Sequence, residues 1–160
     1  MAPPLSFHFP LPFPLKLLYS DMPAYEFFEH TADVGFRARG NSFARALSAA
    51  CEALTDVMTG KAQIARKQVV SFEIDADDAE QLVVDVLSRL VYLFDAEGFV
   101  AGRCEINVKP GWTAAVTVHG EPFDAERHGE GLEVKAVAYH MLKVEQSQPD
   151  QWLIQVLLDV

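Results

Sequence analysis

Three carboxylate-bearing residues stand near opposite ends of the sequence and could together hold a cation. Asp33 lies in the segment EHTADVGFRARG, and the sequence finishes on Asp159 and Val160, which add a second side-chain carboxylate and a terminal one. Three anions brought together repel each other unless a cation neutralises them. Oxygen ligands suit a hard divalent ion such as calcium, with water completing its coordination shell. The sequence predicts a calcium site here if the strands that carry these residues are neighbours.

A structural reading of the same residues stays open at this point. Asp33 could cap a helix or shape a turn, and the last two residues could simply fray, as chain ends commonly do. The terminal segment WLIQVLLDV, however, alternates like a strand up to its final residue. A strand that runs to the end of a chain needs something to hold it, and a bound cation would do so.

The segment 119–144 offers a candidate surface for a protein partner. Its first half is a polar loop and its second half alternates like a strand, with Leu132, Val134, Ala136 and Ala138 expected on one face. Loops carry binding residues disproportionately. The structural alternative is a solvated sheet face with charge pairs between strands, which is the commoner outcome. The residues that would form the docking patch are Asp124, Arg127, His128, Glu133, Lys135 and His140.

The usual catalytic motifs are absent from the sequence. TGKAQ lacks both the first glycine and the Ser or Thr of a phosphate-binding loop, and neither GxSxG nor HExxH occurs. The five histidines are scattered without metal-ligand spacing. These motifs therefore indicate no catalytic residues. A metal-dependent phosphoester hydrolase that uses the same three carboxylates stays open as an alternative to a binding role.

Net charge indicates which classes of partner the protein can bind, and cysteine content indicates its compartment. The chain has 13 Lys and Arg against 23 Asp and Glu, a net charge of −10. Strong direct binding to nucleic acid is not expected, because that affinity comes from neutralising cations. The acidic balance suits a cation or a partner with a basic surface. Cys51 and Cys104 are predicted to be buried free thiols, which fits a reducing cytoplasm.

The first 24 residues differ in composition from the rest of the chain. They hold six of the nine prolines in a strongly apolar stretch. Prolines break any membrane-spanning helix, and the stretch lacks the basic start of a signal peptide. We interpret residues 1–24 as an irregular, disordered extension or an upstream start that translation does not use, and residues 25–160 as one domain. No membrane association is expected, and the predicted location is the cytoplasm.

The spacing of apolar residues from residue 25 onward predicts an α+β protein. One helix is expected over 43–58, capped by Asn41 or Ser42 and ended by Gly60. A second begins at Asp77 in a capping box with Glu80 and is apolar around much of its circumference. Strands are expected at 25–32, 34–39, 69–74, 99–108, 112–118, 132–145 and 151–160.

This order of elements, β-β-α-β-α-β-β-β-β, predicts a largely antiparallel sheet with two helices packed on one face. The last two strands are joined through the polar turn QSQPD at 146–150, which makes them a hairpin. The second helix should be central and well buried, because so much of its circumference is apolar.

Four motifs in order resemble the archease family. They are EHTADVGFRARG, LSRLVYLFDAEG, GEPFDAERHGEGLEVKAVAYHMLKV and the terminal LLDV, and the resemblance covers residues 25–160. Members of that family are small acidic α+β proteins without catalysis of their own. They are accessory factors of the GTP- and manganese-dependent tRNA-splicing RNA ligase, whose guanylylation and multiple turnover they promote. Some modulate tRNA methyltransferases in a chaperone-like way.

The resemblance also implies site residues. The family's metal site uses the aspartate of the TADVG motif and the last two residues, which here are Asp33, Asp159 and Val160. These are the residues whose chemistry already suggested a cation site. The surface that faces the ligase is expected on the strand EVKAVAYH and its preceding loop, which here implies Lys135 and His140.

Overall fold

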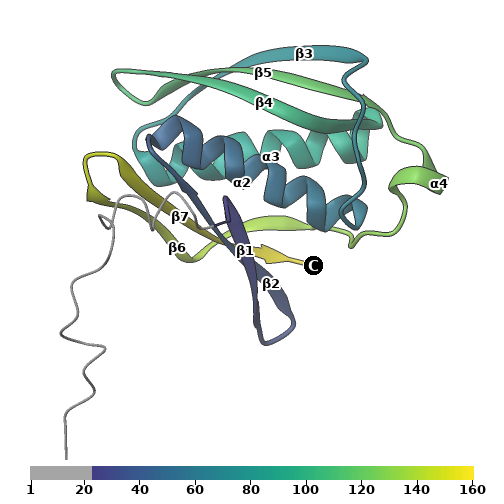
Figure 1. Cartoon of the computed structure of the whole chain (residues 1–160), viewed down its shortest axis with the longest axis horizontal. Coiled ribbons are helices and arrows are strands. Elements are labelled where there is room, and N and C mark those ends of the chain that lie inside the picture. Colours follow the sequence, from purple (N-terminus) through teal and green to yellow (C-terminus); the bar gives the residue numbers. More distant parts are fainter. Residues whose placement is uncertain (1–22) are drawn as a thin grey trace, which may run out of the picture.

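The computed structural model describes residues 23–160, and two antiparallel sheets form its outer layers (Figure 1). The four-stranded sheet has the order β1-β2-β7-β6 and the three-stranded sheet the order β3-β5-β4. The strands of the first are β1 (Tyr25–His30), β2 (Asp33–Gly40), β7 (Gln151–Asp159) and β6 (Ala136–Gln148). Those of the second are β3 (Gln68–Asp75), β5 (Thr113–Pro122) and β4 (Phe99–Lys109).

Two long helices fill the space between the sheets (Figure 1). α2 (Phe43–Thr59) packs against β2 and β4, which belong to different sheets, and α3 (Ala79–Glu97) packs against β6 and β4. A third helix, α4 (Ala125–His128), is a single turn between β5 and β6. The predicted α+β class and element order are confirmed.

The arrangement differs from the expected single sheet, because the strands divide between two sheets and the helices cover one face of each. The apolar character of α3 gives the physical reason. Leu82, Val83 and Leu87 point in several directions around this helix, and each is fully buried. A helix of that kind needs apolar partners on more than one side, and only a second layer supplies them.

The helix ends follow local sequence, with one correction. Ser42 caps α2 by accepting a hydrogen bond from the Arg45 amide, and Gly60 ends it with φ 67°. The α3 cap is Asp78 and not Asp77, so the predicted capping box with Glu80 is wrong. Instead Asp78 accepts from the Gln81 amide, and the Gln81 side chain accepts from the Asp77 amide. The helix is therefore capped one residue later than predicted.

Strand β6 begins at residue 136 rather than 132, because the preceding residues cross the end of α2. The amide of Leu132 donates to the carbonyl of Val57 at 2.9 Å. Gly131 lies so close to Met58 that an added Cβ would meet its carbonyl carbon at 2.2 Å. The expected alternation is therefore wrong, since Leu132 and Ala136 are exposed while Val134, predicted on the same face, is buried.

The two cysteines are free and buried, as predicted. Cys51 on α2 lies beside Cys104 on β4, and a hydrogen bond between the thiols together with burial raises the pKa of Cys51. Among residues 23–160, no helix combines the length and apolarity that crossing a membrane requires. The interpretation of residues 1–24 falls almost entirely outside the described residues and stays a prediction.

Candidate functional site

The structure places the predicted carboxylates at one end of neighbouring strands. β2 and β7 pair antiparallel, with Val34 opposite Leu158. Asp33 precedes Val34 and Asp159 follows Leu158, so the two aspartates start one strand and finish its neighbour. The condition on which the predicted cation site depended, adjacency of these two strands, is therefore met.

Alternation along the strands decides which way these side chains face. Leu158 is fully buried and Val34 packs against the core, on the side that α2 covers. Because successive side chains of a strand point to opposite faces, Asp33 and Asp159 face outward, away from the helices. Asp159 is exposed and Asp33 is half-buried. Both carboxylates are thus presented on the outer face of the four-stranded sheet.

A pair of histidines lies next to the aspartates. His30 is the cross-strand partner of Asp33 in the β1–β2 hairpin. The ring of His30 lies 5.7 Å from the ring of His140, centroid to centroid, although His140 belongs to β6 on the far side of the sheet. The His30 Nδ1 atom is buried, and no partner for it is found among residues 23–160. The structure therefore brings His140 into the neighbourhood of Asp33.

A buried glutamine shapes the strand that carries His140. The pairing of β6 with β7 is irregular between Ala138 and Lys143, and Met141 there has φ 60°. Gln155, only 3% exposed, donates from Nε2 to the Met141 carbonyl at 2.9 Å and accepts from Arg37 Nε at 2.9 Å. Gln155 thereby holds the irregular segment against the outer face of β7.

Lys135 reaches the same end of the sheet through its backbone. Its amide donates to the carbonyl of Asp159 at 2.7 Å, and the next residue, Ala136, pairs with Asp159 in the ladder. The Lys135 side chain is exposed. Residues that the sequence assigned to two functions, cation binding and partner binding, therefore surround one strand end.

The chemistry of the donor set fits a hard cation. Two aspartate side chains and a terminal carboxylate offer only oxygen, the donor that calcium prefers. Among residues 23–160, no three His, Cys, Asp or Glu side chains gather closely enough to hold a metal by themselves. A cation here would thus depend on the carboxylate of Val160 as its third anionic ligand, and calcium binding stays a prediction.

Three residues of the predicted docking loop, Asp124, Arg127 and His128, have partners within the chain. Glu121, 1% exposed, accepts hydrogen bonds from Arg127 Nη1 at 2.6 Å and Nη2 at 2.7 Å. His128 is fully buried, accepts at Nδ1 from the Asp124 amide, and lies with Nε2 3.2 Å from Glu121. Nε2 must then carry the ring proton if the ring is neutral. This Glu121 cluster holds the β5–α4 loop in place, and residues 122–127 stay exposed.

The electrostatics of the Glu121 cluster agree with that role. Hydrogen bonds from Arg127 above all, and then from the Ala65 amide and His128, outweigh the effect of burial and lower the pKa of Glu121 to about 2. The carboxylate stays ionised although it is buried, because both of its oxygens accept hydrogen bonds. No pattern in the sequence singled out Glu121 as the centre of this cluster.

Sequence reasoning also missed His30 and Gln155. His30 was treated as one of five scattered histidines, since its nearness to His140 depends on how the sheet is ordered. Gln155 did carry a signal, because it interrupts the apolar run WLIQVLLDV. A polar residue inside such a run is buried only with partners, so it could have been singled out.

Comparison with known proteins agrees with this fold. The model of the Archease protein family (MTH1598/TM1083) matches residues 25–160. The chain is 36% identical over 142 residues to the protein archease of Pyrococcus furiosus, covering 87% of this chain and 100% of that protein. It is 34% identical over 140 residues to the protein archease of Pyrobaculum calidifontis, covering 85% and 95%.

A solved structure shares the architecture. The solution structure of Methanobacterium thermoautotrophicum protein 1598 aligns with a TM-score of 0.68 at 29% identity, covering 87% of this chain and 100% of that one. A match of the family model across the whole of 25–160, together with relatives above 30% identity, shows the family. The chain belongs to the archease family.

Proposed function

We propose that this chain is a non-enzymatic accessory protein that activates a GTP- and manganese-dependent tRNA-splicing RNA ligase by promoting its guanylylation and turnover. The observation that carries the proposal is that five residues gather at one end of the four-stranded sheet in a chain of the archease family. These residues are Asp33, Lys135, His140, Asp159 and Val160.

The composition of this strand end favours a protein partner. Outward-facing carboxylates stand beside an exposed lysine and histidine, so both signs of charge are presented within a few residues. A surface of mixed sign fixes the orientation of a protein partner, whereas a polyanion would be repelled by a chain of net charge −10.

The carboxylates suggest what the surface contributes to the ligase. A divalent cation held there would supply charge neutralisation, on which phosphoryl transfer from GTP depends. The part of this chain is to place Asp33 and Asp159 on a rigid strand pair, aimed outward, with the core behind them. Lys135 and His140 would orient the partner against that strand end.

The test is a time course of ligase guanylylation with GTP, at a dose of this protein well below that of the ligase. Acceleration with turnover is expected for the native chain. Asp33→Asn and Asp159→Asn should each reduce the acceleration tenfold or more, because each removes an anionic ligand without changing size. Asp95→Asn is the matched control, since Asp95 is an exposed carboxylate at the far end of α3.

A second pair of variants tests the partner surface. Lys135→Ala and His140→Ala should raise the dose needed for half-maximal acceleration while leaving cation binding intact. Lys109→Ala, at the end of β4, is the control of equal charge change. Equal losses for Lys135→Ala and Lys109→Ala would contradict the assignment of this surface.

Failure of the native chain to accelerate an active ligase would sink the ligase proposal. A tRNA methyltransferase as client would then be the next candidate, tested by recovery of soluble, active enzyme with and without this chain. Turnover of phosphoesters with calcium, magnesium or manganese would instead support the hydrolase reading and contradict a non-enzymatic role.

A further inference from the structure

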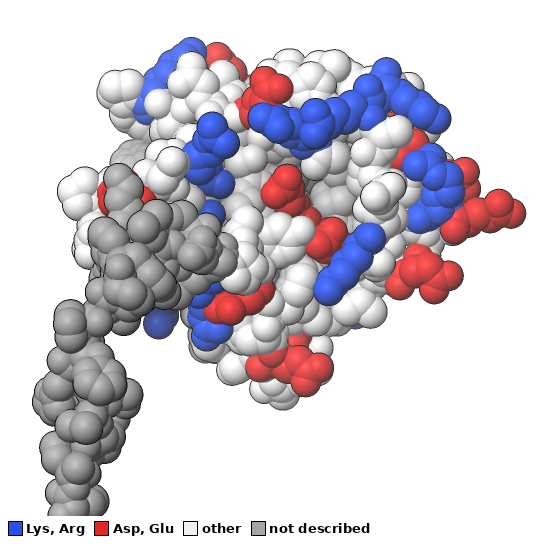
Figure 2. Space-filling view, viewed as in Figure 1, with Lys and Arg blue, Asp and Glu red and all other residues white. Residues whose placement is uncertain are grey.

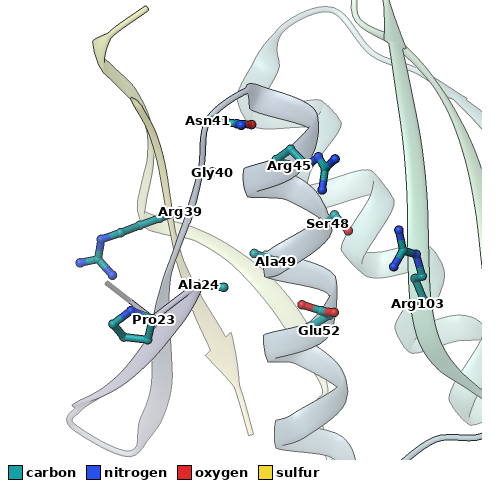
Figure 3. Close-up of a pocket in the computed structure, with 10 residues that line it drawn as sticks. All are labelled: Pro23, Ala24, Arg39, Gly40, Asn41, Arg45, Ser48, Ala49, Glu52 and Arg103. Carbon is teal, nitrogen blue, oxygen red and sulfur yellow. The ribbon is translucent and has the colours of Figure 1, made fainter. Parts of the chain in front are cut away.

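A second polar site lies on the opposite side of β2 from the aspartates, between α2 and the edge strand β4. Arg45, Ser48 and Glu52 stand on one face of α2, and Arg103 on β4 points toward them (Figure 3). Arg39, by contrast, points away from the helix. We call the space lined by Arg45, Ser48, Glu52 and Arg103 the α2–β4 groove.

The groove is large enough for a small organic ligand. Its main cavity measures about 400 Å³, and adjoining cavities of about 240 Å³ and 320 Å³ are also lined by Arg103. Sites for small molecules start at about 300 Å³. Asp33, Lys135, His140, Asp159 and Val160 line none of the three, so the groove is separate from the proposed ligase-activating surface.

The guanidinium groups of Arg45 and Arg103 have donors that the described residues do not use. No ion pair or hydrogen bond of the Arg45 guanidinium is found among the described residues, where only its backbone amide is used to cap α2. Within residues 23–160 the ion pair of Arg103 is long, 3.9 Å from Nε to Glu105 Oε1 with both side chains about half exposed, and the Arg103 charge also acts on Glu52. Such a pair contributes little, which leaves the fork of Arg103 available.

The position of Arg45 is unfavourable without an anion. It lies in the first turn of α2, where no acidic residue stands and where the helix dipole disfavours a positive charge. An anion between Arg45 and Arg103 would offset that cost and would be bound by two planar forks of donors. Ser48 does not take part, since its hydroxyl donates to the Cys104 carbonyl at 2.7 Å.

Acidic side chains occupy the other end of the groove. Glu52 lines both the main cavity and the 240 Å³ cavity, where Asp56 accepts a hydrogen bond from the Tyr25 hydroxyl at 2.6 Å. Burial and, second, the nearby Asp56 raise the pKa of Glu52, while Arg103 and Arg66, which also line the 240 Å³ cavity, act in the opposite direction. Figure 2 shows the same division, with blue side chains over β4 and red ones below them over α2.

We propose that the α2–β4 groove binds an organic phosphate of nucleotide size, with the phosphate between Arg45 and Arg103 and the ligand's hydroxyl or amino donors bonded to Glu52. The division of charge selects this class. A bare polyphosphate would meet the Glu52 carboxylate with nothing to donate, whereas a nucleoside phosphate carries acceptors at one end and donors at the other.

The test uses the full chain labelled with 15N and titrated in turn with ATP and with inorganic pyrophosphate, at low salt and with a chelator in place of divalent cations. ATP should shift the amide signals of residues 42–52 and 101–105 and saturate. Arg45→Ala and Arg103→Ala should each weaken ATP about tenfold or more, the effect of losing a charge-assisted pair. Arg89→Ala, which removes an exposed arginine of α3, is the control and should stay within twofold.

Glu52→Gln separates the two ends of the ligand. The ratio of ATP affinity to pyrophosphate affinity should fall severalfold, because the substitution removes a repulsive charge near the phosphates and weakens the acceptor for the nucleoside. An unchanged ratio would overturn the role of Glu52. The proposal as a whole fails if ATP causes no saturable shifts in these segments, or if Arg89→Ala weakens ATP as much as Arg103→Ala does.

Discussion

Two groups of carboxylates in this molecule differ in burial and in hydrogen bonding. Glu121 is buried, and hydrogen bonds from Arg127, His128 and the Ala65 amide satisfy it within the chain. Asp33 and Asp159 face outward at the end of the four-stranded sheet, and no hydrogen bond or ion pair of either side chain is found among the described residues. The carboxylate with internal partners holds a loop, and those without them are available to a ligand.

The difference shows that an acidic side chain is best judged by what surrounds it rather than by its motif. Both groups lie in segments that the family resemblance singled out, Asp33 in EHTADVGFRARG, Asp159 in LLDV and Glu121 in GEPFDAERHGEGLEVKAVAYHMLKV. A buried ion left without partners is costly, so the Glu121 cluster must be complete within the fold. Exposed carboxylates tolerate the absence of a partner because water solvates them.

The largest effect on stability should come from breaking the Glu121 cluster. Glu121→Ala leaves Arg127 and the buried His128 without their acceptor and should lower the free energy of unfolding by about 3 kcal/mol. Urea denaturation measures this loss. Glu126→Ala, an exposed neighbour on α4, should change stability by no more than about 0.5 kcal/mol. A small effect of Glu121→Ala would mean that the cluster is not what holds the loop.

Calcium bound at Asp33 and Asp159 should raise the stability of the protein by a similar amount. At a concentration about 100-fold above its dissociation constant, the ion should raise the free energy of unfolding by about 2.7 kcal/mol. Asp33→Asn and Asp159→Asn should lose most of this gain, and Asp95→Asn should keep it. Thermal unfolding with calcium and with a chelator gives the comparison. If the gain survives in both site variants, the ion binds elsewhere.

A smaller loss of stability is expected from replacing Gln155, which supports the segment around His140 near the outward-facing carboxylates. Gln155→Leu removes the donor to the Met141 carbonyl and the acceptor for Arg37, and should cost about 1–2 kcal/mol. The segment around His140 should then exchange its amide hydrogens faster, while the Glu121 cluster is unaffected. Hydrogen exchange read by mass spectrometry would contradict this idea if residues 139–142 exchanged at the native rate.

The smallest effect is expected on mild acidification. The pKa of Glu121 is lowered in the folded state to about 2, so its contribution is fully present above its unfolded value of 4.5 and is lost as pH falls toward 2. Stability should therefore change little through Glu121 above pH 4.5 and decline below it. Urea midpoints from pH 6 to pH 3 for the native chain and Glu121→Gln should converge in acid. Parallel curves would argue against an ionised Glu121.

Much of the fold could be predicted from short-range patterns. The helices around 43–58 and beyond residue 77, and the class and order of elements, followed from apolar spacing and caps and are confirmed. The errors arose where local signals compete. Asp77 and Asp78 are both good caps, and the stretch from 132 to 135 alternates like a strand but crosses α2 instead. At 132–135 the contact with α2 decided the outcome, whereas at the cap the hydrogen bonds with Gln81 did.

Of the candidate site, the sequence by itself determined the identities of Asp33, Lys135, His140 and Asp159 and their placement in strands or loops. Only the tertiary structure set β2 beside β7, brought His30 to His140, and enclosed Glu121 with Arg127 and His128. It also divided the strands between two sheets, which opens the α2–β4 groove at one side. The physical reason is the distance along the sequence between the residues that interact. Helix and strand periodicity depends on residues a few positions apart, whereas β2 and β7 pair across more than a hundred residues, and that pairing depends on how the whole core packs.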